Sequence, residues 1–251
     1  MEIILGLDVS TKCIGVTIAK LDDDYNLKLL EITHLRPKIS TKIKGIECLL
    51  LKSKIFSDNL IKFKDYHITK VVIEEPLISS NNSITASTLL KFNGMISQYV
   101  YNILNIIPEF ISSYDARKYA FPELMSIRKY NKKGEEYPLK KIRKSLKNNE
   151  LVLFGSYQWD CDKKLILWNK INELYPNIPW VYKKNGELKD ENFDASDSLV
   201  CVLGYVNLLQ FKDCECNIID FKEHNCDNGT IINYQTIFCE KIFDKKIEIS
   251  K

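Results

Sequence analysis

The sequence has little of what marks disordered, fibrous or membrane proteins. Its 251 residues include only seven prolines and nine glycines, too few for a disordered or collagen-like chain. No apolar run approaches the roughly 18 residues that a membrane-spanning helix requires. The first residues, Met1 to Ile4, have no basic flank and lead directly into a strand pattern. We therefore expect no signal peptide, no membrane association and a cytoplasmic protein.

The cysteines are expected to be reduced, because eight cysteines occur without an export signal. Cys13, Cys48 and Cys201 lie in apolar segments and are interpreted as small core residues. Four further cysteines could bind one structural Zn²⁺ ion, although the paired Cys-x-x-Cys motifs of a zinc ribbon are absent. These four residues are Cys214, Cys216, Cys226 and Cys239.

Composition and hydrophobic pattern indicate one large domain of the α/β class. The chain is 45% hydrophobic and 27% charged, and its net charge of +3 permits nucleic-acid binding without requiring it. We expect a main domain over residues 1–211, with an insertion at about 115–191, and a C-terminal appendage over 212–251.

Short apolar runs alternate with long amphipathic stretches in the first half of the chain. Strands are predicted over residues 3–8, 14–21, 27–35, 70–75 and 109–114, and helices over 43–61 and 84–106. In the first of these helices, Ile46 and Leu50 belong to the predicted apolar face and lysines to the outer face. The second half predicts a short helical turn at 115–119, helices at 165–174 and 193–209, and a hairpin-like tail.

The insertion is rich in basic residues that could hold DNA phosphates. A solvated helical face is the alternative explanation, since charged runs are usually just exposed. The candidates for DNA binding are Lys132, Lys133, Lys140, Lys141, Arg143 and Lys144.

Acidic residues stand at the ends of three separate elements. Asp8 follows the first strand, Glu74 follows the fourth, and Asp194 and Asp197 share one face of the last helix. Each alone has an ordinary explanation: Asp8 could accept the amides of a turn, and Asp194 could cap the helix. Together they also suit two Mg²⁺ ions, which prefer carboxylate oxygens and can clamp a scissile phosphate.

The motifs around these acids resemble those of RuvC-type Holliday-junction resolvases, which belong to the RNase H-like nuclease superfamily. The resemblance is carried by Leu5-Gly6-Leu7-Asp8-x-Ser10, Gly15-Val16, Val72-Ile73-Glu74-Glu75 and Asp194-Ala195-Ser196-Asp197-Ser198-Leu199. It implies an RNase H-like mixed five-stranded sheet flanked by helices, with the insertion placed before the last core helix.

The resemblance also implies catalytic metal ligands at Asp8, Glu74, Asp194 and Asp197, with Mg²⁺ as cofactor and Mn²⁺ as a substitute. Glu75 is not chosen, because neighbouring residues of a strand face opposite sides. The expected activity is that of a crossover junction endodeoxyribonuclease acting on branched DNA by two-metal hydrolysis. Two symmetric cuts imply a homodimer, with the helix over 84–106 as the candidate interface. The Lys- and Asn-rich composition suggests a phage or virus origin, and hence a bacterial host cell.

Three alternatives remain at this stage. A nuclease of the same fold could cut RNA–DNA hybrids or flaps, and a non-catalytic DNA-binding scaffold could share the fold. The presence of all four acids argues against the scaffold. A sugar-kinase or actin-like ATPase is disfavoured, because Val9-Ser10-Thr11-Lys12 follows Asp8 where that family needs a glycine-rich phosphate loop.

Overall fold

A mixed sheet forms the centre of the molecule, in a computed structural model that describes residues 1–76, 83–121, 124, 162–213, 220–225, 231–236 and 248–249. Its strands are β1 (Glu2–Val9), β2 (Ile14–Leu21), β3 (Leu27–Leu35), β4 (Lys70–Glu74) and β5 (Glu109–Ile111). Their order is β5-β4-β1-β2-β3, with β1 to β3 antiparallel and β4 and β5 parallel to β1. The predicted mixed five-stranded sheet is confirmed. A short strand that was not predicted, β8 (Glu248–Ile249), pairs in parallel with β3.

One strand is shorter than the sequence predicted. The apolar pattern continues to Tyr114, but β5 ends at Ile111. The reason is Ser112, whose side chain accepts a hydrogen bond from the amide of Asp115 and caps helix α3 (Ser113–Ala120). The cap draws Ser113 and Tyr114 into the helix, and the predicted turn at 115–119 is part of it.

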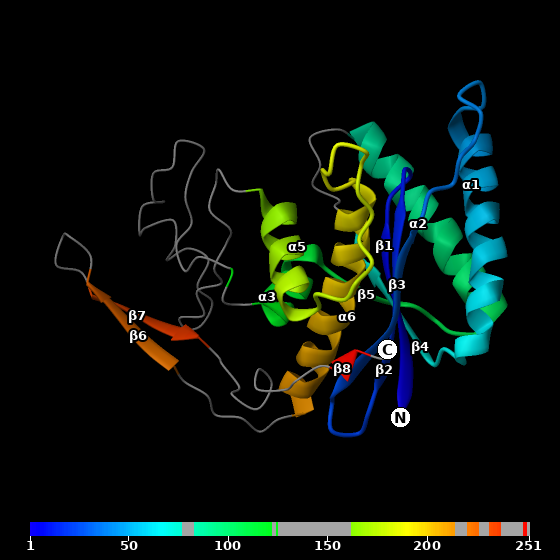
Figure 1. Cartoon of the computed structure of the whole chain (residues 1–251). Coiled ribbons are helices and arrows are strands. Elements are labelled where there is room, and N and C mark those ends of the chain that lie inside the picture. Colours follow the sequence, from blue (N-terminus) through cyan, green and yellow to red (C-terminus); the bar gives the residue numbers. More distant parts are fainter. Residues whose placement is uncertain are drawn as a thin grey trace.

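Helices cover both faces of the sheet, giving three layers (Figure 1). Helices α1 (Gly45–Leu60) and α2 (Ser83–Leu104) pack on one face, where they meet side chains such as Leu5 and Leu7. On the other face, α3 lies with α5 (Lys163–Leu174) and α6 (Glu191–Asp213) in a second core that includes Ile4. Alternate residues of β1 therefore serve opposite layers, as expected of a central strand.

The buried face of α1 differs from the predicted one. The predicted apolar residues Ile46 and Leu50 are 55% and 51% exposed. Leu60 is buried as predicted, but the rest of the buried stripe consists of Leu49 and Phe56, with Ser53 fully buried between them. The Ser53 hydroxyl donates a hydrogen bond to the carbonyl of Leu50 at 2.9 Å, so this serine can occupy a core position. A pattern of apolar residues does not predict a serine there.

Helix α6 lies unusually close to the sheet, because glycines face it. A Cβ added to Gly6 would lie 2.3 Å from Val202 Cγ2 and 2.7 Å from the carbonyl oxygen of Ser198. A Cβ added to Gly15 would lie only 1.8 Å from the carbonyl oxygen of Asp194. Between these points, the hydroxyls of Thr17 and Ser198 share a buried hydrogen bond of 2.8 Å.

The second half of the chain agrees with the predicted elements where it is described. Helix α5 packs Leu167 and Ile171 into the same core as α6, so this part of the insertion is integral to the domain. Strands β6 (Asp220–Asn225) and β7 (Ile231–Thr236) form an antiparallel hairpin in the C-terminal appendage. Among the described residues, no helix has the length and apolar character needed to cross a bilayer. A 3₁₀ helix, Ile61–Tyr66, follows α1.

Replacing Gly15 by alanine should destabilise the protein by about 2 kcal/mol or more, because the new methyl group would force α6 away from β2. Gly94 is the matched control: it lies within α2, and an added Cβ would have no neighbour within 4 Å. Gly94→Ala should leave stability unchanged or raise it by up to about 1 kcal/mol. Urea unfolding of both variants checks this, and equal stabilities would contradict the close docking of α6.

Candidate active site

Two of the predicted acids lie at the same level on neighbouring strands. In the parallel ladder of β1 and β4, Leu7 is opposite Ile73, so Asp8 and Glu74 follow together at the carboxyl ends of these strands. In the turn after Asp8, the amide of Ser10 has an acceptor other than the Asp8 carboxylate. The amide of Ser10 donates to the carbonyl of Cys13, and the Ser10 side chain receives the amide of Cys13.

The first turns of α6 bring the other two acids to the same edge. Asp8 is opposite Gly15 in the β1–β2 ladder, and Gly15 touches the backbone of Asp194. The start of α6 is fixed by the buried Asn192, which accepts from the amide of Val181 at 3.0 Å and donates to its carbonyl at 2.7 Å. Arg36, just after β3, forms an ion pair with Glu191. Contacts with the sheet therefore fix the position of α6, and with it the positions of Asp194 and Asp197.

The acids influence one another strongly. Burial, followed by the charges of Glu74, Asp197 and Asp194, raises the pKa of Asp8 well above its usual range. Burial and the charge of Asp197 raise the pKa of Glu74 to about 7. Burial also raises the pKa of Asp197, against the opposing effect of two nearby cations. The structure thus brings all four predicted acids together, and the exposed Glu75 is not among the groups that perturb them.

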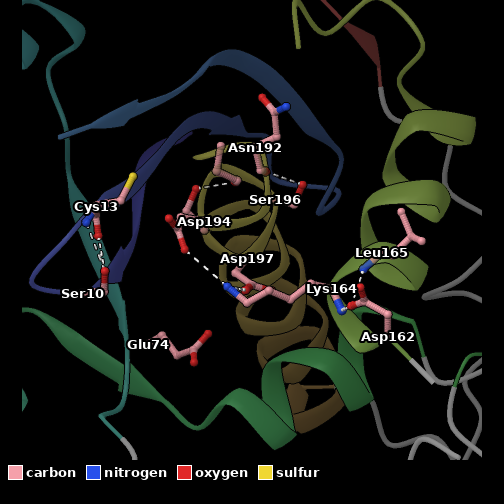
Figure 2. Close-up of polar contacts among 12 residues, drawn as sticks. Ser10, Cys13, Glu74, Asp162, Lys164, Leu165, Asn192, Asp194, Ser196 and Asp197 are labelled. Atoms are coloured by element: carbon pink, nitrogen blue, oxygen red, sulfur yellow. Dashed lines mark hydrogen bonds and ion pairs between the residues drawn. The ribbon is translucent and has the colours of Figure 1, made fainter. Parts of the chain in front are cut away.

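The two cations were not predicted from the sequence. Lys164, near the start of α5, has its Nζ 3.3 Å from Asp194 Oδ1 and 3.7 Å from Asp197 Oδ2. Arg117 of α3 lies 3.7 Å from Asp197 Oδ1. Figure 2 shows Lys164 reaching from α5 to the first turns of α6, with Glu74 across the site. In the sequence, Lys164 directly precedes the predicted helix over 165–174. That position alone does not indicate which acids the lysine contacts.

Two cysteines line the site. The buried Cys201 thiol lies 3.8 Å from Glu74 Oε2, and burial followed by the charge of Glu74 raises the pKa of Cys201. Burial and the charge of Asp194 likewise raise the pKa of Cys13. Both residues are free and buried, as predicted for core cysteines, whereas Cys48 is only half-buried. A thiol whose pKa is raised stays protonated at neutral pH and adds no charge to the site.

The donor chemistry of the four acids suits Mg²⁺ or Mn²⁺, because hard cations take oxygen ligands. Four carboxylates and two cations leave two negative charges when every group is ionised. A divalent ion would supply the missing charge. In the described part of the chain, no group of three or more His, Cys, Asp or Glu side chains is arranged to hold a metal ion as it stands. Two of the carboxylates contact Lys164 instead.

The other predicted binding residues lie outside the described residues. They are the phosphate-binding candidates Lys132, Lys133, Lys140, Lys141, Arg143 and Lys144, and the zinc candidates Cys214, Cys216, Cys226 and Cys239. Both sets stay predictions.

Comparison with known proteins gives matches among solved structures alone. No protein-family model matches the chain, and no curated protein matches it. RuvC of T. thermophilus, in complex with a Holliday junction substrate, is 8% identical, with a TM-score of 0.48 over 84% of this chain and 96% of that one. The yeast mitochondrial Holliday junction resolvase Ydc2 is 12% identical, with a TM-score of 0.44 over 81% of this chain and 77% of that one.

A viral structure is also similar. The Fowlpox virus resolvase, in complex with Holliday junction DNA, is 16% identical, with a TM-score of 0.41 over 82% of this chain and 98% of that one. The three similar structures are thus those of Holliday junction resolvases, each at a TM-score below 0.5.

Metal binding should release protons below neutral pH. The pKa of Glu74 is about 7 in the metal-free fold and 4.5 ordinarily, so the folded protein holds a proton there that the unfolded chain has released. The contribution of Glu74 to stability without metal should therefore fall as pH rises from about 4.5 to 7. A bound cation must displace this proton, so the apparent affinity for Mn²⁺ should increase with pH over the same range.

Calorimetry in buffers of different ionisation enthalpy measures the proton release. Near pH 6, the wild type should release about one proton more than the Glu74→Gln variant, which has no carboxyl proton to lose at this position. The raised pKa of Asp8 adds to the proton release of both proteins alike. Equal release by the two proteins near pH 6 would contradict the raised pKa of Glu74.

Proposed function

We propose that this protein is a metal-dependent endonuclease that resolves Holliday junctions or other branched DNA. The observation that carries the proposal is the meeting of Asp8, Glu74, Asp194 and Asp197 at one edge of the sheet, on three elements distant in sequence. Burying several carboxylates together is costly unless cations join them. Such a cluster is therefore typical of a site that binds cations, and carboxylate oxygens suit divalent cations in particular.

The elements that carry these acids are rigid, which suits catalysis better than a loop would. Asp8 and Glu74 end paired strands, and α6 is fixed against β2 by direct backbone contact. Divalent cations held there would polarise the phosphodiester and lower the pKa of the attacking water. The sequence resemblance to RuvC-type resolvases implies branched DNA as the substrate.

A homodimer is part of this proposal, because resolving a four-way junction requires two symmetric cuts. Helix α2 buries Phe92, Ile96 and Val100 in the core that it shares with α1 and the sheet. It exposes Leu90 and Tyr101, at 44% and 51%, and these residues are available for a contact between two copies. Sedimentation velocity of the purified protein measures the oligomeric state directly.

The substrate is tested by incubating the full chain with labelled four-way junction, flap, RNA–DNA hybrid and linear duplex, in Mg²⁺ or in EDTA. Paired cuts of the four-way junction in Mg²⁺ are expected. Preferential cutting of the hybrid or flap would favour the alternative nuclease of the same fold. Absence of metal-dependent cutting on every substrate would favour a non-catalytic scaffold.

Asp8→Asn should abolish cleavage while leaving affinity for the four-way junction unchanged or higher. The substitution keeps the shape of the side chain but removes a carboxylate that would bind metal and, when ionised, would repel phosphate. Cleavage and gel-shift assays on the same preparation measure the two properties separately. Glu75→Gln is the matched control, since Glu75 is exposed beside the site and should be dispensable. Wild-type cleavage by Asp8→Asn would reject the proposed mechanism.

Replacing Lys140, Lys141 and Lys144 together by alanine should weaken binding to all DNA sequences alike. Each lost phosphate contact should also lower the slope of log affinity against log salt by roughly 0.9 on duplex DNA. The control replaces three exposed lysines beside or on α1, which removes the same total charge: Lys42, Lys54 and Lys62. If only the control variant changes the slope, the DNA path runs over α1 instead.

A further inference from the structure

Lys164 has a position in the acid cluster that a cation from solution would otherwise take. Its Nζ lies within 4 Å of both acids of α6, at 3.3 Å from Asp194 and 3.7 Å from Asp197. Partial burial lowers the pKa of Lys164, but the charges of Asp197, Asp194 and Asp8 outweigh this and raise it above its ordinary value. The side chain therefore remains an ammonium ion at neutral pH, and it faces the same carboxylates that are proposed to bind metal.

We propose that Lys164 is a built-in counter-ion, which holds Asp194 and Asp197 in the metal-free protein and must leave them before a divalent cation can bind. This inference rests on the proposed function, because it takes the four acids as metal ligands. It adds a regulatory property that the acids themselves do not have. The affinity of the site for metal is set by competition between the ion and a residue of the same chain.

The geometry explains why Lys164, rather than Arg117, would be displaced. Of the four acids, Arg117 forms an ion pair only with Asp197, and its side chain is 19% exposed. Its helix is pressed against α6, where a Cβ on Gly204 would lie 2.3 Å from the carbonyl oxygen of Ala116. The side chain of Lys164 is 47% exposed and touches both acids. A lysine with a flexible four-carbon stem and solvent on one side can swing away without moving its helix.

Release of Lys164 from the acids has two measurable consequences. Without metal, Lys164 relieves the repulsion between Asp194 and Asp197, so its removal should destabilise the protein. With metal, the ion takes over this role, and the lysine only opposes binding. Loss of the positive charge should therefore lower stability in EDTA and raise affinity for metal, two effects of opposite sign from one substitution.

The experiment compares Lys164→Met, which keeps much of the stem and removes the charge, with Lys163→Met and Lys164→Arg in the full chain. Lys163 is the matched control, since it is exposed on the same helix turn and, among the described residues, forms no ion pair with the acids. Calorimetric titration with Mn²⁺ should give roughly tenfold tighter binding for Lys164→Met, and affinities within about twofold of wild type for the other two.

Thermal unfolding gives the second readout. In EDTA, the Tm of Lys164→Met should lie about 2–4 °C below that of Lys163→Met, and the difference should vanish or reverse in saturating Mn²⁺. Equal Mn²⁺ affinities and equal Tm values in all variants would overturn the counter-ion role while leaving the metal site intact. Failure of every variant and of the wild type to bind Mn²⁺ would overturn the proposed function, and the competition with it.

Discussion

Repulsion among carboxylates at one end of the sheet is the constraint on which the site depends. Two like charges 4 Å apart repel by about 4 kcal/mol at an effective dielectric constant of 20, against a typical domain stability of about 5–15 kcal/mol. The protein meets this demand in two ways. Protons are retained, as the raised pKa values of Asp8 and Glu74 show, and cations are supplied by Lys164 and Arg117. Both devices are reversible, which a site that exchanges metal ions requires.

The close approach of α6 to the sheet gives this repulsion its strength. Without side chains at Gly6 and Gly15, the helix backbone rests directly on β1 and β2, and its acids are brought to the level of Asp8. The hydrogen bond between Thr17 and Ser198 satisfies the polar groups that such contact buries. The close docking of α6 therefore produces both the tight packing and the repulsion among the acids. A helix docked less closely would reduce the repulsion among the acids, but it would also separate the proposed ligands of a shared metal ion.

The sequence was sufficient to predict the acids and insufficient to predict their counter-ions. Asp8 and Glu74 are recognisable because a buried strand ends at each of them, and Asp194 and Asp197 because they are three positions apart on one helix. Lys164 and Arg117 lie in segments of weak periodicity, and only tertiary packing determines which acids they meet. Similar reasons explain the misassigned face of α1, where a serine in the core interrupts the apolar pattern, and the unpredicted two-residue strand β8.

The acids and the cations come from different parts of the fold. The acids lie on β1, β4 and α6, which belong to the central sheet and the helix docked on it. The cations lie on α3 and α5, the helices that precede and follow residues 125–161 in the chain. Because α3 and α5 both pack against α6, a displacement of either helix would change the charge balance at the acids as well as the packing of the core. The segment with the candidate DNA-binding lysines is thus joined at both ends to helices whose side chains neutralise the site. A change in that segment that moves either helix would therefore also change the electrostatics of the acid cluster.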